Sequence, residues 1–167
     1  DDATDVSTWY HDFDSDTYGD PTDSEESCTA PNNHVADDTD CDDGNSGVNT
    51  AAAEICDLDD NDCDGFVDDD DSDVDTSTGT EFYDDGDGDG FGDPTDSAFS
   101  CAQPSGYTND NTDCDDTLFA VNTDADEVCS TAYDDNCDGV ANEDSATDAT
   151  LWYADTDTDG YGDASSS

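Results

Sequence analysis

The sequence contains no lysine and no arginine, while 51 Asp and Glu residues give it a formal net charge of −51. No Lys or Arg salt bridge can form, and so much like charge opposes any compact state at neutral pH. A chain of this charge also repels nucleic acid and anionic membrane surfaces, so neither is an expected partner. Only a dense load of cations would let it condense.

Long apolar runs are missing as well, so we expect no insertion into a membrane. No lysine, G-x-S-x-G motif or Ser/His/Asp arrangement indicates catalysis, so we expect neither an enzyme nor a small-molecule substrate. The chain begins at Asp1 without Met, which favours a processed product or a piece of something longer. Low hydrophobicity with high net charge is also typical of disordered chains, and the remaining features have to overcome this alternative.

What the sequence does contain is an internal repeat. The stretch WYHDFDSDTYGDPTDS at residues 9–24 returns as FYDDGDGDGFGDPTDS at 82–97, and WYADTDTDGYGD at 152–163 repeats its first part. The cysteines keep step, because Cys28, Cys41 and Cys56 recur 73 positions later as Cys101, Cys114 and Cys129. A random acidic tail would not show this order. The sequence therefore predicts repeat 1 at residues 1–73, repeat 2 at 74–146 and the start of an incomplete repeat 3 at 147–167.

Each repeat carries runs of alternating aspartates, which we call ladders. A calcium loop places oxygen ligands at alternate positions, a glycine at position 6, a carbonyl ligand at position 7 and another ligand at position 9. Three ladders fill this scheme: Asp85, Asp87, Asp89, Phe91, Asp93 and Asp96; Asp155, Asp157, Asp159, Tyr161 and Asp163; and Asp60, Asp62, Asp64, Phe66, Asp68 and Asp71. Their recurrence with the repeat indicates cation binding.

Two further ladders depart from the scheme. The first comprises Asp12, Asp14, Asp16, Tyr18, Asp20 and Asp23. Thr17 replaces its glycine, which predicts a strained or weaker loop. The second comprises Asp134, Asn136, Asp138, Val140 and Asn142. Its two amides carry less charge, so we expect weaker binding there.

The last pair of ladders has no glycine at position 6. These ladders are Asp38, Asp40, Asp42 and Asp43 in repeat 1, and Asn111, Asp113, Asp115 and Asp116 in repeat 2. Glu54 and Glu127 are candidates for a bidentate carboxylate from across each loop. Oxygen ligands in this number favour Ca²⁺ over Mg²⁺, Zn²⁺ or Cu²⁺, at about seven candidate sites.

An even count of eight cysteines indicates disulfides and hence an oxidising, extracytoplasmic compartment. Four cysteines in each repeat allow three pairings. Local spacing favours Cys28–Cys41 with Cys56–Cys63, and Cys101–Cys114 with Cys129–Cys137.

The fold class that follows is a set of small, irregular, loop-rich and β-poor tandem modules stapled by Ca²⁺ and disulfides. We expect short β-hairpins around the ladders and single helical turns at residues 47–56 and 118–129. His11 and His34 are either a copper or zinc ligand pair or two surface residues. Repeat 2 has Asp84 and Tyr107 at these positions, which favours surface residues.

The stretches NTDCDD at residues 111–116 and DNDCDG at 60–65 resemble a family of secreted bacterial and archaeal repeats, the MopE-type metal-binding domain. The ladders are similar to thrombospondin type 3 calcium repeats. The resemblance implies extracellular, tandemly repeated modules that are stapled by Ca²⁺ and have little regular structure. It also implies copper binding where a tryptophan lies near two histidines, as Trp9 and His11 allow in repeat 1.

The sequence thus predicts an extracellular or cell-surface structural protein that binds calcium and forms part of a rod, stalk or filament. Its expected partner is itself, in a tandem or end-to-end array. The alternative is a secreted cation-binding or adhesion module that acts in Ca²⁺ buffering, Ca²⁺-dependent adhesion or copper capture. A weaker alternative is a disordered polyanion that nucleates mineral.

Overall fold

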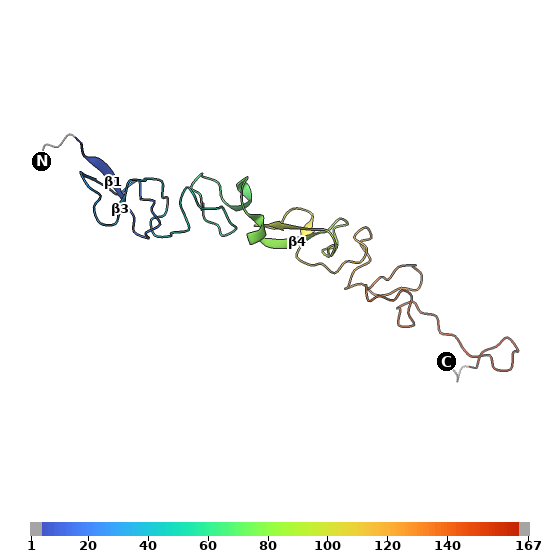
Figure 1. Cartoon of the computed structure of the whole chain (residues 1–167). Helices are drawn as coiled ribbons and strands as arrows, with labels where there is room; N and C mark the ends of the chain where they lie inside the picture. The colour runs from blue at the N-terminus through green and yellow to red at the C-terminus, as the bar shows by residue number, and fades with distance from the viewer. Residues whose placement is uncertain (1–4, 164–167) are drawn as a thin grey trace. The chain divides into compact units, whose positions relative to one another are not determined.

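The computed structural model describes residues 5–163, and within this range regular structure is sparse. The elements are β1 (Ser7–His11), β2 (Ser24–Ser27), β3 (His34–Val35), η1 (Asp68–Asp70), η2 (Thr76–Thr78), β4 (Thr80–Asp84), β5 (Ser97–Ser100) and β6 (Tyr107–Thr108) (Figure 1). No helix among the described residues is long and apolar enough to cross a membrane. The predicted loop-rich, β-poor architecture is confirmed.

Between residues 5 and 163 the strands form two small sheets with the orders β2-β1-β3 and β5-β4-β6. In the first sheet β1 lies antiparallel to both neighbours, with Ser7 opposite Ser27 and Tyr10 opposite Val35. In the second, β4 runs antiparallel to β6, with Tyr83 opposite Thr108. The ladder at residues 12–20 connects β1 to β2, and the ladder at 85–93 connects β4 to β5. The predicted hairpins around these ladders are therefore present.

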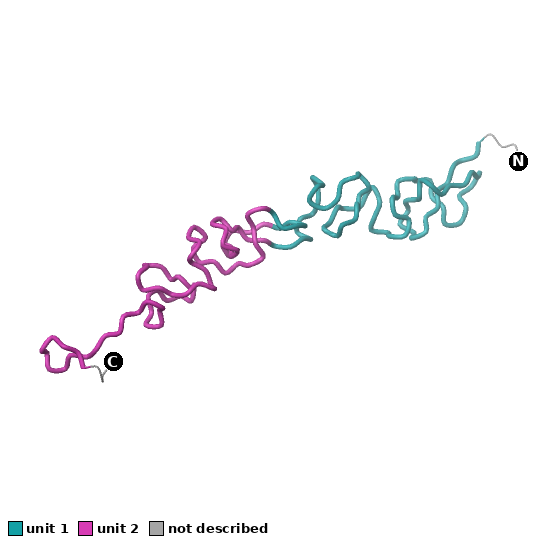
Figure 2. Tube along the Cα trace, turned by 180° about the vertical axis from the view of Figure 1, so that it is seen from behind, with its two compact units in different colours: residues 1–81, 99–104 teal, residues 82–98, 105–167 magenta. Residues whose placement is uncertain are grey.

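The chain divides into two compact units (Figure 2). Unit 1 contains Asp1–Glu81 together with Phe99–Pro104, and unit 2 contains Phe82–Ala98 together with Ser105–Ser167. These units are not the sequence repeats, because a short segment of repeat 2 folds with unit 1. The disulfide between Cys56 and Cys101 holds that segment there.

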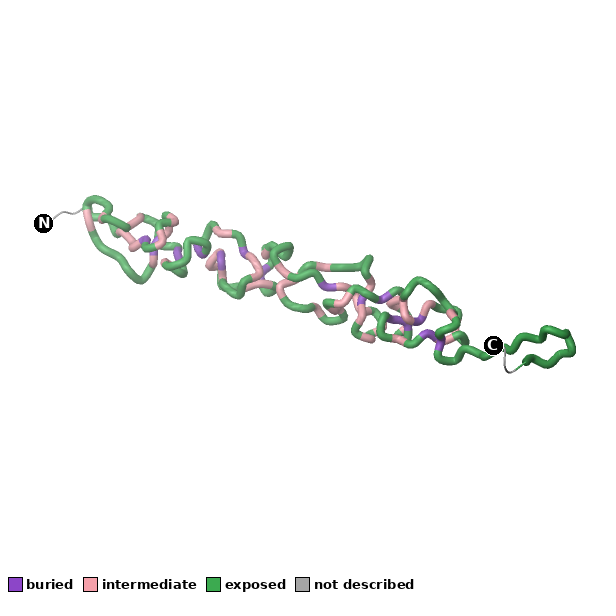
Figure 3. The backbone as a smooth tube through the Cα atoms, turned by 90° about the horizontal axis from the view of Figure 1, so that it is seen from below, coloured by how far each residue is buried: buried purple, intermediate pink, exposed green. Residues whose placement is uncertain are grey.

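Few of the described residues are buried in either unit (Figure 3), and only a minority of the buried ones are apolar. Val48 is the buried apolar residue of unit 1 among those described, and unit 2 buries Phe82, Val121 and Ala146. The buried polar residues are more numerous: Asp12, Asp40, Asn49, Glu54, Asn61, Asp71, Asp113, Asn122, Glu127 and Asp135. A core of this size cannot supply the stability of a domain through hydrophobic burial. The fold has to depend on cross-links and on whatever neutralises its carboxylates.

Three disulfides cross-link the described part of the chain, and their connectivity differs from the predicted one. They join Cys41 to Cys63, Cys56 to Cys101 and Cys114 to Cys137. Cys28 and Cys129, which we expected to be bonded, are free and exposed. The pairing favoured by local spacing is therefore wrong.

The reason for this error is the way in which distant ladders meet. The Asn49 N–H donates to the Asn61 carbonyl at 2.9 Å, which brings the segment after Cys41 alongside the ladder that contains Cys63. The Asn122 N–H makes the same contact with the Asp135 carbonyl in unit 2. Spacing along the chain carries no information about such contacts.

The predicted helical turns at residues 47–56 and 118–129 are not helices; they are separate turns. The side-chain oxygen of Asn49 accepts the Ala51 N–H, and that of Asn122 accepts the Asp124 N–H, both at 3.0 Å. Such local side-chain bonds offer the backbone an alternative to helical hydrogen bonds. The 3₁₀ helices η1 and η2 lie elsewhere, in the joint between the repeats.

Candidate metal sites

The five ladders that match the calcium-loop scheme, or nearly so, share one backbone conformation. Position 4 has positive φ in each: Ser15, Cys63, Gly88, Cys137 and Thr158. So does position 6: Thr17, Gly65, Gly90, Gly139 and Gly160. Thr17, at φ 87°, is the one side chain that has to adopt this conformation at position 6, so the predicted strain is present.

Backbone N–H groups orient the ladder carboxylates. In every one of these ladders the N–H of position 7 donates to a carboxylate oxygen of position 5: Tyr18 to Asp16, Phe66 to Asp64, Phe91 to Asp89, Val140 to Asp138 and Tyr161 to Asp159, at 2.8–2.9 Å. The N–H of position 5 donates in the same way to the oxygen of position 3. These bonds fix one oxygen of each side chain, and the second oxygen of Asp14 and of Asp87 has no hydrogen-bond partner.

In unit 1 two ladders meet in one cluster, which we call the hairpin cluster. It comprises Asp12, Asp14, Asp16, Asp40 and Asp43, whose oxygens form groups lying within 4.8 Å of one another. The Phe13 N–H donates to Asp43 Oδ1 at 2.6 Å and thereby joins the two ladders. Asn49 donates from its side-chain amide to Asp16 Oδ2 at 2.8 Å.

Unit 2 repeats the hairpin cluster at the equivalent positions, where the charges of Asp85, Asp87 and Asp89 act on Asp113 and Asp116. The Gly86 N–H donates to Asp116 Oδ1 at 2.8 Å, as the Phe13 N–H does to its partner in unit 1. Asn122 donates to Asp89 Oδ2 at 2.7 Å. The same geometry therefore arises twice from the repeated sequence.

The hairpin clusters are electrostatically unsatisfied. Desolvation, followed by the charges of neighbouring aspartates, raises the pKa of the carboxyls of Asp14, Asp40, Asp87, Asp113 and Asp116. The Oδ2 atoms of Asp14, Asp40, Asp87 and Asp113 are buried without a hydrogen-bond partner. Buried carboxylates of one sign are costly unless a cation or another donor pairs with them. A bound cation would remove both penalties.

A second cluster, the glutamate cluster, lies between Glu54 and Asp71 in unit 1. Oxygens of Glu54, Asp62 and Asp71 lie within 4.8 Å of one another, and so do those of Asp60, Asp62 and Asp64. Glu54 is only 2 % exposed, and its two oxygens accept the N–H groups of Asn61 and Asp68 at 2.7 and 2.9 Å. Asp71 Oδ2 is buried without a partner.

The glutamate cluster of unit 2 carries less charge. Glu127 accepts the N–H groups of Asp135 and Asn142 at 2.8 and 2.6 Å, as Glu54 does in unit 1. Asn136 stands in place of an aspartate and donates to Glu143 Oε1 at 3.5 Å. Glu143 Oε2 is buried without a partner. Sequence reasoning missed Glu143, since it lies outside the ladder spacing, but an acidic residue directly after the ladder was the available signal.

The two glutamates do not lie where the sequence placed them. We expected Glu54 to complete the Asp38–Asp42 ladder, but it lies beside Asp62 and Asp71. Asp40 and Asp43 of that ladder join the hairpin cluster instead. Asp38, the first residue of that ladder, hydrogen-bonds Tyr10. Desolvation raises the pKa of the Tyr10 phenol most, and the charge of Asp38 raises it further.

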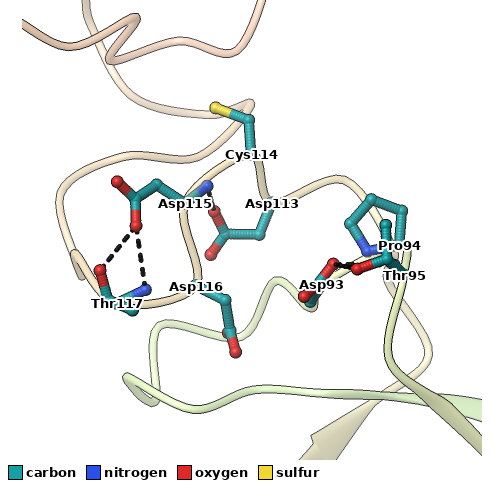
Figure 4. A pocket seen from close by; sticks show the side chains of 8 residues that line it. All are labelled: Asp93, Pro94, Thr95, Asp113, Cys114, Asp115, Asp116 and Thr117. Carbon is teal, nitrogen blue, oxygen red and sulfur yellow. Dashed lines mark hydrogen bonds between the residues drawn. The ribbon is translucent and has the colours of Figure 1, made fainter.

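Several predicted ligands make other contacts. Asp115 turns its carboxylate to Thr117, whose Oγ1 donates at 2.6 Å, while Asp113 accepts the Asp115 N–H at 2.8 Å and Asp116 points away from both bonds (Figure 4). This group lines an open pocket together with Asp93, Pro94, Thr95 and Cys114. In unit 1 Asp42 Oδ1 accepts the Gly44 N–H at 3.3 Å.

In the ladders that begin at Asp12 and Asp85, positions 9 and 12 lie on the turn that leads into β2 or β5. Asp20 and Asp93 each accept the side-chain and backbone donors of the threonine two residues later, and these bonds lower their pKa values. Asp23 and Asp96, at position 12, are exposed. The ladder at residues 155–163 is exposed along its whole length.

Cysteine thiolates are not available to these clusters. Cys41, Cys63, Cys114 and Cys137 lie within or beside the ladders, and all four are consumed in disulfides. Apart from the His11 ring nitrogen beside Asp43, the donors at the clusters are therefore oxygen atoms. This donor set suits hard cations that prefer carboxylates and carbonyls.

The two histidines are neighbours. They lie opposite each other in the β1–β3 pair, with ring centroids 5.3 Å apart. His11 Nδ1 also lies 3.0 Å from Asp43 Oδ2, next to the hairpin cluster. His34 Nδ1 lies 3.0 Å from the Asn32 carbonyl oxygen. The sequence left open whether these histidines form a pair or are separate surface residues, and the strand register brings them together.

Comparison with known families bears directly on the two segments that carry the ladder disulfides. Residues 40–69 and 113–143 match the Cu-binding MopE family, described as a "putative metal-binding motif". The chain carries two copies of this motif. Each MopE-type motif contains one ladder disulfide and the buried glutamate of one glutamate cluster. The motif resemblance seen in the sequence is confirmed. Neither the curated proteins nor the solved structures include a match.

Proposed function

We propose that this chain is an extracellular calcium-binding structural protein, built from tandem modules that form part of a rod, stalk or filament. In this role it binds no nucleic acid, inserts into no membrane and catalyses no reaction. Its partner is a further copy of itself. The chain's two MopE-type metal-binding motifs and its disulfides are the starting point for the proposal.

The observation that carries the proposal is the convergence of buried carboxylate oxygens without partners. Asp14 and Asp40 in unit 1, and Asp87 and Asp113 in unit 2, each direct such an oxygen into a cluster of like charge. Without a cation these groups repel one another and oppose folding. Cation binding and folding are therefore coupled on this proposal.

Calcium is the cation that this donor chemistry favours. The clusters offer several carboxylates in loops that differ in detail, and Ca²⁺ accepts six to eight oxygen ligands in flexible geometry. Mg²⁺ requires a nearly ideal octahedron and retains most of its water. Zn²⁺ and Cu²⁺ favour nitrogen and sulfur donors, which the clusters offer only through His11 in unit 1.

An extracellular location agrees with the cross-links, because disulfides persist in oxidising compartments. A repeated module whose stability comes from ions and disulfides also needs no large core. These features support a structural role more than a buffer, for which disulfides and regular repeats would not be required.

Electron microscopy of negatively stained protein separates this proposal from a soluble cation-binding or adhesion module. We expect ordered assemblies in millimolar CaCl₂ that disperse after EDTA and return when calcium is restored. Mg²⁺ at the same concentration serves as the matched control and should not restore them. Particles of constant monomeric size in every condition would contradict the structural role and favour the module.

A second candidate function is copper binding by repeat 1, which the pairing of His11 with His34 favours. Two imidazoles beside Asp43 are a donor set that Cu²⁺ accepts. A titration with Cu²⁺, followed by its visible absorption, should show one site that His11→Asn and His34→Asn each abolish. Unchanged binding in both variants would exclude these residues as ligands.

A further inference from the structure

A short chain of hydrogen bonds joins the hairpin cluster of unit 1 to the glutamate cluster of the same unit. The side-chain amide of Asn49 donates to Asp16 Oδ2, in the hairpin cluster, at 2.8 Å. The backbone N–H of Asn49 donates to the Asn61 carbonyl at 2.9 Å. The Asn61 N–H donates in turn to Glu54 Oε2, in the glutamate cluster, at 2.7 Å. Two residues, which we call the bridge, therefore connect a carboxylate of one cluster with a carboxylate of the other.

Unit 2 contains the same bridge, formed by Asn122 and Asp135. The Asn122 amide donates to Asp89 Oδ2 at 2.7 Å, and its backbone N–H donates to the Asp135 carbonyl at 3.0 Å. The Asp135 N–H donates to Glu127 Oε2 at 2.8 Å. The second bridge residue differs between the units because only its backbone connects the clusters. The first residue, whose side chain takes part, is asparagine in both units.

Both bridges are buried, since all four of their residues are shielded from solvent: Asn49, Asn61, Asn122 and Asp135. Water cannot easily replace a partner that is lost in such a place. Breaking one link therefore leaves a buried polar group unsatisfied, which is costly. The bridge keeps its geometry only while the carboxylates at its two ends keep theirs.

The chemistry of asparagine suits the end of the bridge at the hairpin cluster. Its amide nitrogen donates to Asp16, while its amide oxygen accepts the Ala51 N–H at 3.0 Å. An aspartate in place of Asn49 would lack the donor and would place another negative charge beside Asp16. The other oxygen of Asp16 accepts the Tyr18 N–H, so both oxygens are oriented, and each retains a lone pair for a cation.

The ladder disulfide connects the same two clusters a second time. Cys41 directly follows Asp40 of the hairpin cluster, and its partner Cys63 lies within the ladder of the glutamate cluster. The bond between Cys114 and Cys137 has the equivalent place in unit 2. One covalent and one hydrogen-bonded connection thus limit how far the two clusters of a unit can change independently.

Each cluster of unit 1 contains a buried carboxylate that a cation would satisfy. Asp40 in the hairpin cluster and Asp71 in the glutamate cluster are 2 % and 4 % exposed, and the Oδ2 atom of each is buried without a hydrogen-bond partner. A cation in either cluster stabilises its ordered form. Because the bridge is shared, the first cation orders residues that the second also needs. The second cation therefore binds with a smaller loss of conformational entropy.

The negative charge of the clusters limits repulsion between the two cations. In unit 1 the hairpin cluster and the glutamate cluster contain five acidic residues each. These ten negative charges exceed the four positive charges of two divalent cations. A second cation therefore still approaches a site of opposite charge after the first is bound.

We propose that Asn49 and Asn122 are positioning residues that couple the two clusters of their own unit, so that calcium in one cluster raises the calcium affinity of the other. Such coupling is reciprocal, because either cluster affects the other by the same factor. The two clusters of a unit then fill together rather than one by one. This inference rests on the proposed binding of calcium and adds cooperativity to it.

Terbium luminescence measures the hairpin cluster of unit 1 by itself. Tb³⁺ replaces Ca²⁺ at oxygen sites and emits when a nearby tryptophan is excited. The chain contains two tryptophans, so Trp152→Phe in the whole chain leaves Trp9, three residues before Asp12, as the one tryptophan sensitiser. Displacement of Tb³⁺ by Ca²⁺, followed with tryptophan-selective excitation, then gives the calcium affinity of this cluster.

The experiment is a double-mutant cycle of Asn49→Ser and Glu54→Gln in that background. Asn49→Ser keeps a side-chain oxygen for the Ala51 N–H but removes the donor to Asp16. We expect Glu54→Gln, which lies in the other cluster, to lower the calcium affinity of the hairpin cluster about fivefold or more. In the Asn49→Ser chain, Glu54→Gln should have no further effect.

Glu127→Gln and Asn122→Ser are the matched controls, because they make the same changes in unit 2. They should weaken binding there without changing the affinity read through Trp9. An equal effect of Glu54→Gln with and without Asn49→Ser would show that Asn49 has only a structural role, and would overturn the coupling.

If Asn49→Ser does not fold in calcium, Asn49→Asp replaces it in the cycle, since aspartate keeps the size of the side chain and the acceptor for Ala51 but removes the donor. Glu54→Gln alone is also decisive, because a hairpin cluster with unchanged affinity in this variant contradicts the coupling.

The coupling and the proposed calcium binding fail separately. Calcium that displaces Tb³⁺ equally well from all four chains of the cycle contradicts the coupling and leaves calcium binding intact. A chain that binds neither Tb³⁺ nor Ca²⁺ contradicts the proposed function and the coupling with it.

Discussion

At the scale of single residues, aspartate performs two tasks in this chain. Asp14 accepts the Asp16 N–H through Oδ1, which shapes the turn, while its Oδ2 is buried without a partner and faces like charges. The Asp87 side chain in unit 2 does the same. A side chain that both forms a turn and offers a ligand explains why aspartate, rather than glutamate, fills the ladders.

Thr17 is the residue where local strain should be relieved most readily. Thr17→Gly should raise stability in calcium by about 0.5–1 kcal/mol, because relief of the positive φ exceeds the added entropy of the unfolded chain. Thermal unfolding followed by circular dichroism measures the change. Thr17→Ala is the control, since it removes the hydroxyl and keeps the Cβ; an equal gain from Ala would contradict strain as the cause.

Glu54 should matter more than its single charge indicates. Glu54→Gln keeps the size of the side chain but weakens the acceptor for two N–H groups and removes a ligand, so we expect loss of calcium from the glutamate cluster of unit 1. Isothermal titration calorimetry should show fewer sites or a clearly weaker one. Glu26→Gln, on the exposed strand β2, should titrate like the wild type.

At the scale of elements, the sequence predicts the conformation of each ladder well but does not predict which ladders contact one another. Positive φ at position 6 and the N–H bonds within each ladder are local, so glycine spacing was enough to predict them. Which ladders meet depends on contacts such as that of Asn49 with Asn61, which join distant segments. The move of Glu54 to the second cluster, the disulfide pairing and the histidine pair all follow from such contacts. None of them leaves a periodic signal in the sequence.

The ladder disulfides should carry a large share of the stability of each unit. The Cys41→Ser/Cys63→Ser double variant opens a loop with a sequence separation of 22 residues, for which the loss expected from chain entropy is about 3 kcal/mol. We expect a clear fall in Tm in calcium. Cys28→Ser should melt at the wild-type temperature, because Cys28 is unbonded. Equal effects of the two changes would show that the Cys41–Cys63 bond is absent or without consequence.

At the scale of the whole molecule, two features oppose folding: the net charge of −51 and the small amount of buried apolar surface. The stability therefore has to come from bound cations and disulfides. This division explains how a composition typical of disordered chains is compatible with defined, repeated clusters.

The metal-free chain should respond to pH in the opposite direction from most proteins. The pKa values of Asp14, Asp40, Asp87, Asp113 and Asp116 are raised in the folded state, so their contribution to stability is fully present below the unfolded pKa of about 3.8 and is lost as the pH rises through the folded values. In EDTA we therefore expect folding to improve on acidification from pH 7 towards pH 4.

In saturating calcium the trend should reverse, since protons then compete with the cation for the same oxygens. Near-UV circular dichroism over the same pH range measures both cases. A metal-free chain that unfolds further on acidification would contradict the electrostatic account of the clusters.

The most direct test of the central claim is to count calcium ions on the folded chain by native mass spectrometry. The account predicts at least one tightly held Ca²⁺ for each hairpin cluster and each glutamate cluster, and loss of the compact charge-state distribution when EDTA removes the ions. A chain that stays compact with no calcium bound, or that holds well under one ion per cluster, would contradict it.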